Sequence, residues 1–429
     1  MSVSERLYYA DSFLRGFSAA VTDVRELLRS EGESVWQLAL DRTAFYPASG
    51  GQPSDTGMLQ ATSRGGAVLD LPVESVEEDE HGEVWHFVRK PLTAGTHVEG
   101  RIDWPRRFDH MQQHTGQHLL SAVFLRELQA ATVSFHLGEN LSTIDLACAP
   151  PAHHSLERVE RIANEIIAED RVVSARYLER AEAESMLAAG DLRKLPERSG
   201  RIRLIEIAGY DRNACGGTHV RSTGQIGGLL LRGTEKVTRG VRLEFVCGLR
   251  AVRAARADFG VLSQAVGALS VGPADLPAAV ERLKSDLKAG AKERQRLIEQ
   301  LADYHAARLA VEVPIEKGLR LVQRSWRDRD RDYVRLLASR LAAAAPSTVA
   351  VLGSEDGGLV RMVLSRSMDL DFHCGQLMKE ALAGFGLRGG GSPDLAQGDV
   401  PPEHAAALRG ALVEALRAAL EPPRSSQPS

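Results

Sequence analysis

The sequence has few cysteines and few aromatic residues. Its 429 residues contain four Cys and 5% Phe, Trp and Tyr. So low a cysteine content excludes a disulfide-stapled secreted fold. No uninterrupted apolar run approaches the roughly 18 residues of a membrane span, and the start, MSVSERLYYADSF, lacks the basic and apolar regions of a leader. We therefore expect a cytoplasmic protein with reduced thiols, in which Cys148, Cys215, Cys247 and Cys374 bind metal or pack.

The sequence also lacks a large net charge, because 53 Lys and Arg oppose 57 Asp and Glu. A net charge of −4 excludes a uniformly basic nucleic-acid coat, but the charge is unevenly distributed. Residues 1–100 contain 8 basic and 16 acidic side chains, whereas residues 201–256 contain 11 basic and 4 acidic ones. We expect separate modules, with a positive rim formed by residues 201–256.

At about 100–200 residues per domain, the length predicts two to four domains. Residues 1–100 contain short strand patterns with turn residues between them, which predicts a small N-terminal β-barrel. Residues 101–250 mix helices with antiparallel strands, which predicts an α+β domain. The expected strands are 35–40, 84–88 (half-buried), 142–148, 202–207, 228–231 and 241–246, and the expected helices are 109–128 and one N-capped by Ser155.

The second half of the chain begins with a helical pattern. Residues 251–312 predict a long helical linker, in which Leu276, Val280, Leu283 and Leu287 have the 4-3-4 spacing of an amphipathic helix or coiled coil. Residues 313–429 predict a C-terminal α/β domain. Its expected elements are strands at 349–352 and 360–364, a helix at 377–383, a glycine-rich loop and a last helix at 402–420. The fold class is α+β, multidomain.

Two separate motifs carry potential metal ligands. In a helix, His114 and His118 lie on one face about 6 Å apart, so that they can grip one ion. A second half-site, Cys215-Gly-Gly-Thr-His219, places a thiolate and an imidazole on a glycine turn. Two unconnected polar clusters are the alternative, but three His and one Cys together match tetrahedral Zn²⁺, which we favour.

The residues around the first motif narrow its chemistry. A metalloprotease with this spacing carries Glu directly after the first His, whereas Thr115 stands here, so that function is excluded. His110 lies one turn earlier and can be a ligand, a partner of a ligand or a water-facing side chain, and we favour the non-ligand interpretations. Asp109 can cap the helix or orient a ligating imidazole.

The two half-sites resemble the editing domain shared by alanyl-tRNA synthetases, threonyl-tRNA synthetases and free-standing alanyl-tRNA editing proteins. The segment from Phe45-Tyr46-Pro47 to Asp55-Thr56-Gly57 resembles the loop of the β-barrel that precedes this domain. Gly389-Gly-Gly-Ser-Pro-Asp-Leu-Ala-Gln-Gly398 resembles the DHHA1 domain, although Ser392 stands where that family often has a basic residue. The order of the parts is similar to that of the long free-standing form.

This resemblance implies a trans-editing hydrolase that deacylates mischarged tRNA(Ala), chiefly Ser-tRNA(Ala) and also Gly-tRNA(Ala). It implies bound Zn²⁺. Because four ligands would close the metal's coordination shell, either one ligand, Cys215 or His219, is loose and yields to an attacking water or to the substrate amine, which we favour, or the metal mainly orders the site. The implied partners are tRNA(Ala) and a second copy of the chain, bound through the linker or the C-terminal domain. No membrane partner is expected. The implied residues are the metal ligands His114, His118, Cys215 and His219, the substrate contacts Thr132, Ser134, Gly216 and Gly217, and the tRNA contacts Arg388, Gly389, Gly390 and Gly391.

Several other interpretations compete with this one. The main alternative is a non-catalytic, zinc-stabilised tRNA-binding or co-chaperone protein. Cys215 as a covalent nucleophile is disfavoured because a zinc-bound thiolate is a poor one. A phosphoesterase lacks its Asp-rich metal motifs, and a complete alanyl-tRNA synthetase does not fit because about 100 residues precede the zinc helix. The glycines at 216–217 and 389–391 are equally compatible with an ordinary turn and loop.

Overall fold

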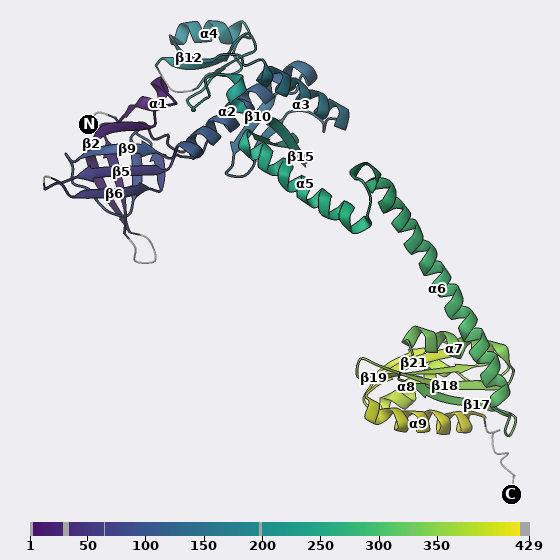
Figure 1. The fold of residues 1–429 in the computed structure, drawn as a ribbon. Helices are drawn as coiled ribbons and strands as arrows, with labels where there is room; N and C mark the ends of the chain where they lie inside the picture. The colour runs from purple at the N-terminus through teal and green to yellow at the C-terminus, as the bar shows by residue number, and fades with distance from the viewer. Residues whose placement is uncertain (1–2, 29–33, 64, 197–199, 328, 421–429) are drawn as a thin grey trace. The chain divides into compact units, whose positions relative to one another are not determined.

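The computed structural model describes residues 3–28, 34–63, 65–196, 200–327 and 329–420. The chain divides into two compact units, Met1–Ala265 and Val266–Ser429 (Figure 1). Each unit has its own hydrophobic clusters. Within the described ranges, no helix is both long and apolar enough to cross a membrane. The finer division at residues 100, 250 and 312 stays a prediction.

The first sheet of unit 1 has seven antiparallel strands arranged around one apolar core. Its longest strand, β2 (Gly16–Leu28), pairs with β3 (Ser34–Leu40) along one part and with β9 (His97–Ile102) along another. The strand order is β6-β5-β9-β2-β3-β8-β7, so closure into a barrel stays a prediction. The other elements here are β1 (Glu5–Arg6), α1 (Leu7–Ala10), β4 (Arg42–Thr43), β5 (Gly57–Thr62), β6 (Val68–Val73), β7 (Ser75–Glu78) and β8 (Val84–Val88).

Strand β8 lies where the sequence predicts it, but the prediction of a half-buried strand is wrong. Val84, His86 and Val88 face the core, as the alternation indicates. Trp85, on the opposite face, is only 3% exposed because the Arg25 guanidinium lies 3.9 Å from its ring centroid and Asp79 accepts its indole N–H. Trp85 is covered by residues from other strands and loops, and an alternating pattern within one strand cannot predict such contacts.

Helix α2 (Trp104–Leu128) is buried at every position from His110 to Phe124. It begins earlier than expected, because Asp103 is its N-cap and Pro105 occupies the first turn. Asp109 therefore lies inside the helix and caps nothing. Its carboxylate instead receives the Arg250 guanidinium at 2.8 and 2.9 Å.

Helix α2 packs in the largest core of unit 1, beside α3 (His153–Ala168) and an antiparallel four-stranded sheet. The N-cap position of α3 is Ala152, so the expected cap at Ser155 is wrong: this residue lies within the first turn. The sheet has the order β10-β11-β16-β15. Its strands are β10 (Thr132–Leu137), β11 (Ser142–Leu146), β15 (Leu229–Val237) and β16 (Gly240–Cys247).

A third sheet in unit 1 includes strands that the sequence patterns did not reveal. β12 (Val173–Leu178) pairs with β13 (Ile202–Ile207), which pairs with the short β14 (Asp211–Ala214). Only the two ends of β12 are buried, so this strand lacks the alternation of a half-buried one. β14 leads directly into Cys215. The remaining helical elements of this region are α4 (Arg180–Ala188), the 3₁₀ turn η1 (Thr223–Ile226) and α5 (Leu249–Leu269).

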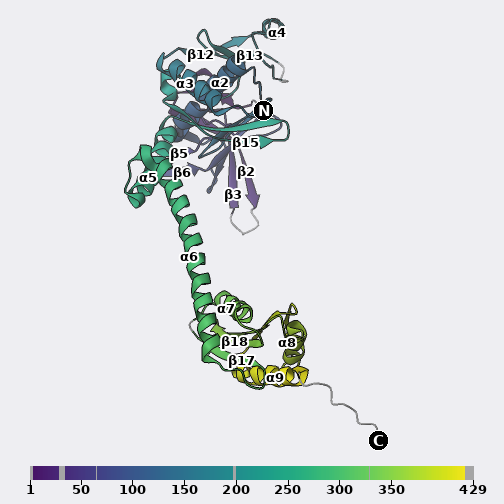
Figure 2. The same ribbon diagram turned by 90° about the vertical axis from the view of Figure 1, so that its right-hand side faces the viewer.

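Unit 2 is a mixed five-stranded sheet with helices on both faces (Figures 1 and 2). β17 and β18 are parallel and joined by α7, whereas the other strand pairs are antiparallel. The predicted α/β arrangement, a helix between parallel strands, is therefore present only in β17-α7-β18. Val322, Ala350 and Leu352 pack against α6 and α7, and the opposite face packs against α8 and α9. The elements are η2 (Pro273–Asp275), α6 (Leu276–Glu312), β17 (Arg320–Trp326), α7 (Arg331–Ala344), β18 (Thr348–Asp356), β19 (Leu359–Arg366), α8 (Cys374–Ala383), β20 (Gly389–Gly391), β21 (Leu395–Val400) and α9 (Pro402–Leu420).

The expected glycine-rich loop of unit 2 is a strand. Gly389, Gly390 and Gly391 form β20, which pairs with β21. A Cβ atom at Gly389 would lie 2.2 Å from Leu382 Cδ1 and 2.8 Å from the Gln397 carbonyl oxygen. The glycine therefore permits α8 to pack closely on the sheet edge. This requirement comes from Leu382 of α8, before the glycine run, and from Gln397 of β21, after it.

We predict that Gly389→Ala destabilises unit 2 by about 1–3 kcal/mol, because its methyl group overlaps Leu382. The measurement is urea-dependent hydrogen exchange of the β18 and β19 amides. Gly410→Ala in α9 is the matched control: no atom lies within 4 Å of its added Cβ, so it should stabilise by about 0.5–1 kcal/mol. Equal effects of the two substitutions would contradict the packing role of Gly389.

Candidate metal centre

The fold brings the two predicted half-sites together. His114 and His118 project from α2, and Cys215 and His219 from the turn that follows β14. One nitrogen from each imidazole and the thiol sulfur all lie within 4.8 Å of one another. Cys215 Sγ lies 3.4 Å from His114 Nε2 and 3.3 Å from His219 Nε2. This cluster can hold a metal ion.

Neighbouring side chains orient two of the imidazoles. His114 Nδ1 donates to Gln52 Oε1 at 2.8 Å, and His219 Nδ1 lies 3.1 Å from Thr115 Oγ1. The Gln52 oxygen can only accept, so the proton of His114 lies on Nδ1 and the Nε2 lone pair faces the sulfur, which is the tautomer that binds a metal. The Thr115 hydroxyl orients the His219 ring so that its Nε2 also faces the sulfur. Thr115, the residue that excluded a protease, thus lies where it can support a ligand.

Burial favours the neutral form of every ligand. It lowers the pKa of His114 to about 3, and it lowers the pKa of His118 and His219 well below the ordinary value. Burial also raises the pKa of the Cys215 thiol. Neutral imidazoles bind metal directly, whereas the thiol must lose its proton as the ion binds. Three nitrogens and one sulfur are a donor set that fits a tetrahedral ion.

The turn that carries Cys215 is held by an arginine and a glycine. Arg203 donates to the carbonyl oxygens of Cys215 at 2.9 Å and Gly217 at 2.8 Å. A Cβ atom at Gly217 would lie 2.1 Å from His114 Cε1, so only glycine allows the turn to approach the α2 imidazole. The Gly217 N–H points to Cys215 Sγ at 3.4 Å, and it is therefore committed to the thiol.

The N-terminal sheet region contributes a residue that the sequence analysis did not assign. Gln52 accepts hydrogen bonds from His114 Nδ1 and the Thr218 N–H, and it donates to Thr218 Oγ1 at 2.9 Å. One amide thus joins both half-sites. The Gly-Gly-Gln-Pro run was recognised as a loop, but the role of its Gln depends on a partner 62 residues away.

A small hollow opens beside the cluster. Its volume is about 80 Å³, and His114, Cys215, Gly216 and Gly217 form one wall. The opposite wall comes from the N-terminal region, where Arg6 donates to the Tyr9 hydroxyl at 3.2 Å. The other lining residues there include Tyr8, Tyr46, Ser49 and Glu78.

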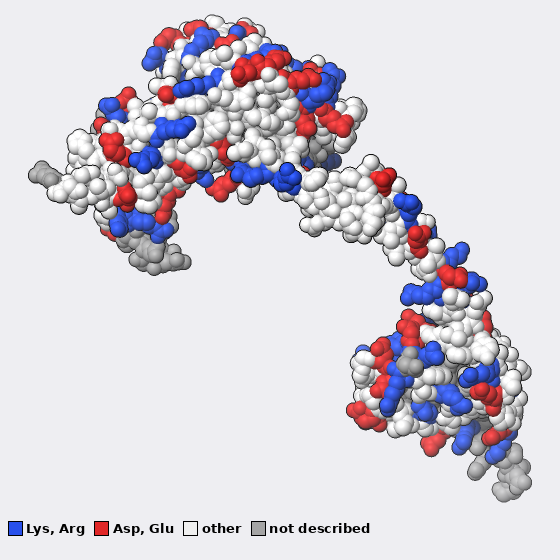
Figure 3. Space-filling view, viewed as in Figure 1, with Lys and Arg blue, Asp and Glu red and all other residues white. Residues whose placement is uncertain are grey.

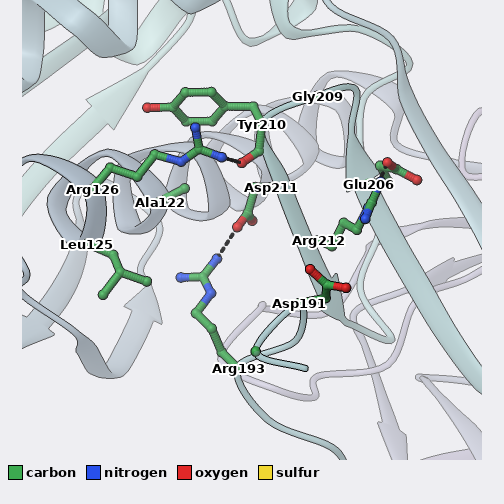
Figure 4. A pocket seen from close by; sticks show the side chains of 11 residues that line it. Ala122, Leu125, Arg126, Asp191, Arg193, Glu206, Gly209, Tyr210, Asp211 and Arg212 are labelled. Carbon is green, nitrogen blue, oxygen red and sulfur yellow. Dashed lines mark hydrogen bonds and ion pairs between the residues drawn. The ribbon is translucent and has the colours of Figure 1, made fainter. Parts of the chain in front are cut away.

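A larger hollow of about 340 Å³ lies where α2 meets β14 (Figure 4). It begins at Ala122, one helical turn beyond His118. Figure 4 shows Arg126 over the Tyr210 ring and Arg193 paired with Asp211 at 2.6 Å. Arg212 also pairs with Glu206, so Arg193 and Arg212 are neutralised by carboxylates, whereas Arg126 contacts only the ring and the carbonyl oxygen of Tyr210.

The predicted substrate contacts Thr132 and Ser134 lie on β10, outside the lining of both hollows. Thr132 Oγ1 donates to Ser121 Oγ at 2.7 Å, and Ser121 accepts from Gln117. Ser134 donates to Asp145 on the exposed side of the strand. Thr132 is thus hydrogen-bonded to helix α2, which carries His114 and His118. A role of Thr132 and Ser134 in binding substrate stays a prediction.

His110 is not part of the cluster. It is 1% exposed, so the water-facing interpretation is wrong. Its Nδ1 has no partner among the described residues, and burial, aided by the charges of Arg106 and Arg250, lowers its pKa to about 3.

The expected positive rim at residues 201–256 is partly neutralised, because five of its 11 basic side chains have an acidic partner. Arg212, Arg221, Arg232, Arg242 and Arg250 each pair with a carboxylate. On the face of unit 1 in Figure 3, basic and acidic residues are interspersed. Four of these five carboxylates come from outside residues 201–256, so the local count of charges overstates the positive charge of this surface.

Comparisons with known proteins match three parts of this chain. The model of the threonyl and alanyl tRNA synthetase second additional domain matches residues 202–243, which include Cys215 and His219. The model of class II (A) tRNA synthetases matches residues 2–106, and the DHHA1 model matches residues 320–418.

The similar curated proteins are alanine–tRNA ligases. That of Pyrococcus abyssi is 34% identical over 92% of this chain and 42% of its own length. That of Natronomonas pharaonis is 33% identical over 98% and 44%. The chain spans less than half the length of these relatives. The C-Ala domain of Aquifex aeolicus alanyl-tRNA synthetase is 21% identical, covering 25% of this chain and 96% of that one, with a TM-score of 0.22 that is too low to bear on the fold.

These matches define a protein related to the alanyl-tRNA synthetases. More particularly, they support an alanyl-tRNA-synthetase-like editing protein with a DHHA1 tail.

We predict that Gln52→Leu lowers metal affinity about 10–100-fold, because it removes the bond that orients His114. Competition with a chromophoric chelator measures the affinity. Gln60→Leu on β5, which removes an exposed hydrogen bond to Asp70 of β6, is the control and should leave the metal affinity unchanged. Wild-type affinity in Gln52→Leu would mean that the metal cluster does not depend on this contact.

Proposed function

We propose that the chain is a trans-editing hydrolase that deacylates mischarged tRNA(Ala), chiefly Ser-tRNA(Ala) and also Gly-tRNA(Ala), with a zinc ion held by His114, His118, Cys215 and His219. The observation that carries this proposal is the convergence of the four ligand atoms beside a small hollow. The matches to the second additional domain and to alanine–tRNA ligases support tRNA(Ala) as the partner.

In this proposal, zinc when bound supplies Lewis acidity toward a water or the ester carbonyl. Gln52 holds His114 in its metal-binding tautomer, and Thr115 orients the His219 ring. The hollow beside Cys215 is small enough to select a seryl or glycyl group, and the Tyr9 hydroxyl, held by Arg6, offers a polar contact to a serine side chain. Gly216, on the same wall, keeps its predicted role as a substrate contact.

The tRNA body would be bound by the C-terminal domain, residues 313–429, through Arg388 and the Gly389–Gly391 segment. Arg388 is exposed beside β20. Because β20 is a sheet-edge strand with no bulky side chains, the backbone of a nucleic acid can approach it closely.

We predict that His114→Ala abolishes Ser-tRNA(Ala) deacylation and lowers bound zinc, because it removes one ligand. Zinc content by mass spectrometry and release of labelled serine measure the two effects. His153→Ala, on the exposed start of α3, is the matched control and should retain both. Full deacylation by zinc-free protein would overturn the zinc mechanism.

The same assay separates the competing functions. Failure of the wild-type chain to hydrolyse Ser-, Gly- or Ala-tRNA(Ala) would leave a non-catalytic zinc-stabilised tRNA-binding or co-chaperone protein. The match of residues 2–106 to class II (A) synthetases favours a second candidate, aminoacylation. ATP-dependent charging of tRNA(Ala) with alanine tests it directly.

We predict that Arg388→Glu weakens tRNA(Ala) binding at low salt and reduces the slope of log affinity against log salt by about 1, because one phosphate contact is lost. Lys292→Glu, an equal charge change on the exposed face of α6, should have a smaller effect. Filter binding over a salt series measures both variants. Identical slopes for wild type and Arg388→Glu would remove this residue from the tRNA site.

A further inference from the structure

The larger hollow of unit 1, of about 340 Å³, is bounded by the same two segments that carry the metal ligands. On α2, the hollow begins at Ala122, which lies four residues, or about 6 Å of helix, beyond His118. On β14, it includes Asp211, four residues before Cys215. Alternate residues of a strand face the same side, so the side of β14 that carries Asp211 also leads to Cys215.

Along both segments, the metal cluster lies between this hollow and the small one. His114 and Gly217 line the small hollow of about 80 Å³. Ala122 and Asp211 line the larger hollow, on the other side of His118 and Cys215 in the chain. A molecule that reacts at the metal and fills the small hollow with one end therefore has the larger hollow available for its other end.

One arginine of the larger hollow reaches toward the metal cluster. Burial, together with the charges of His114 and Arg193, lowers the pKa of His118 well below its ordinary value. Because the effect of a charge on a pKa weakens with distance, the Arg193 guanidinium lies in the neighbourhood of this ligand. Asp211 Oδ1 holds it there by accepting one of its N–H groups at 2.6 Å. An arginine has five N–H donors, so further donors remain for a bound molecule.

The far wall of the larger hollow offers a flat cationic surface. The Arg126 guanidinium carbon lies 4.1 Å from the centroid of the Tyr210 ring, and the guanidinium also donates to the Tyr210 carbonyl oxygen. Figure 4 shows this group between the Tyr210 ring and the ion pair of Arg193 with Asp211. A guanidinium that is held over an aromatic ring leaves its other face open, and nucleobases stack on such planes. Leu125, which is 37% exposed, adds an apolar edge.

We propose that the larger hollow binds the terminal nucleoside of the aminoacyl-tRNA substrate, with the base stacked on Arg126 and the ribose beside Arg193. This inference rests on the proposed function and adds to it a site for the nucleoside. The ester bond joins the amino acid to the ribose, so the ribose has to lie near the metal cluster and the base farther away. The two arginines follow this order, because Arg193 lies near His118 and Arg126 lies two helical turns beyond it.

The charges and size of the hollow fit a nucleoside. The ionisable side chains that line the hollow have no net charge, since three cations face three anions: Arg126, Arg193 and Arg212 against Asp191, Glu206 and Asp211. A polyphosphate requires an excess of cations, whereas an uncharged nucleoside requires a stacking surface and hydrogen-bond donors. The volume of about 340 Å³ lies within the range of small-molecule sites, about 300–1,000 Å³. The small hollow, of about 80 Å³, is left for the aminoacyl group.

The fluorescence of 2-aminopurine tests the proposal without requiring catalysis. The terminal adenosine of uncharged tRNA(Ala) is replaced by 2-aminopurine riboside, whose emission falls when it stacks. We expect saturating wild-type chain to quench the emission, and Arg126→Ala and Arg126→Lys to lose this quenching, because lysine keeps the charge but has no plane to stack on. Arg161→Ala, on the exposed face of α3 and outside the hollow, is the matched control and should quench as wild type does.

The kinetics of Ser-tRNA(Ala) deacylation give a second readout. Arg126→Ala should raise KM about tenfold, which corresponds to the loss of one stacked base, and should leave kcat nearly unchanged. Arg126→Lys should not restore KM, whereas a purely electrostatic role of Arg126 would let lysine restore it. Thermal unfolding followed by circular dichroism verifies that both variants are folded.

The outcomes separate this site from the proposed function. No quenching by wild type, or equal quenching by Arg126→Ala, would overturn the nucleoside site even if the chain deacylates Ser-tRNA(Ala). Quenching that depends on Arg126 in a chain that hydrolyses no aminoacyl-tRNA would retain the site and overturn the proposed function. Free 2-aminopurine riboside 5′-monophosphate is the last arm: if it is quenched at the same micromolar concentrations as the tRNA, the hollow is a site for free nucleotides and the assignment to the tRNA end is wrong.

Discussion

A buried ion pair between Arg107 and Asp55 determines how the N-terminal region meets the metal helix. Neither side chain has any exposed surface. Arg107 also donates to the carbonyl oxygens of Ser12 and Ala44, and Asp55 accepts the Tyr46 N–H at 2.6 Å. A charge buried this deeply is tolerated only when its partners are fixed, so the loop and the first turns of α2 are held in one arrangement. That arrangement places Gln52, three residues before Asp55, on His114.

The metal cluster follows from this arrangement and from two others. Helix α2 supplies two imidazoles from one face, and the turn after β14 approaches them because Gly217 has no side chain. Arg203 then fixes the turn through its carbonyl oxygens. The ligands thus come from two half-sites about a hundred residues apart in the chain, and Gln52 links both. Loss of any of these contacts would let a ligand atom move away from the other three, and the residues that hold the ligands in place are accordingly buried polar groups.

Unit 2 contains two glycine positions whose surroundings are opposite. Its glycine run reads as a loop in sequence, yet Gly389 forms a sheet-edge strand because α8 lies against it. Gly290, in contrast, lies in open space on α6, and its missing side chain leaves a hollow in an otherwise regular apolar stripe. In a sequence, a glycine can therefore mark either a close approach of another segment or an open space. Only the segments that pack around it in the folded chain show which of the two applies.

By itself, the sequence determined the features that depend on local spacing. His114 and His118 share a helix face because they are four residues apart, and the strand at 202–207 and the helix at 402–420 lie where their patterns predict. The tertiary structure alone decided the partners that come from elsewhere: Arg250 for Asp109, Gln52 for His114, and the cover over Trp85. Periodicity and turn chemistry act over a few residues, whereas burial and hydrogen-bond pairing depend on segments that meet only when the chain has folded.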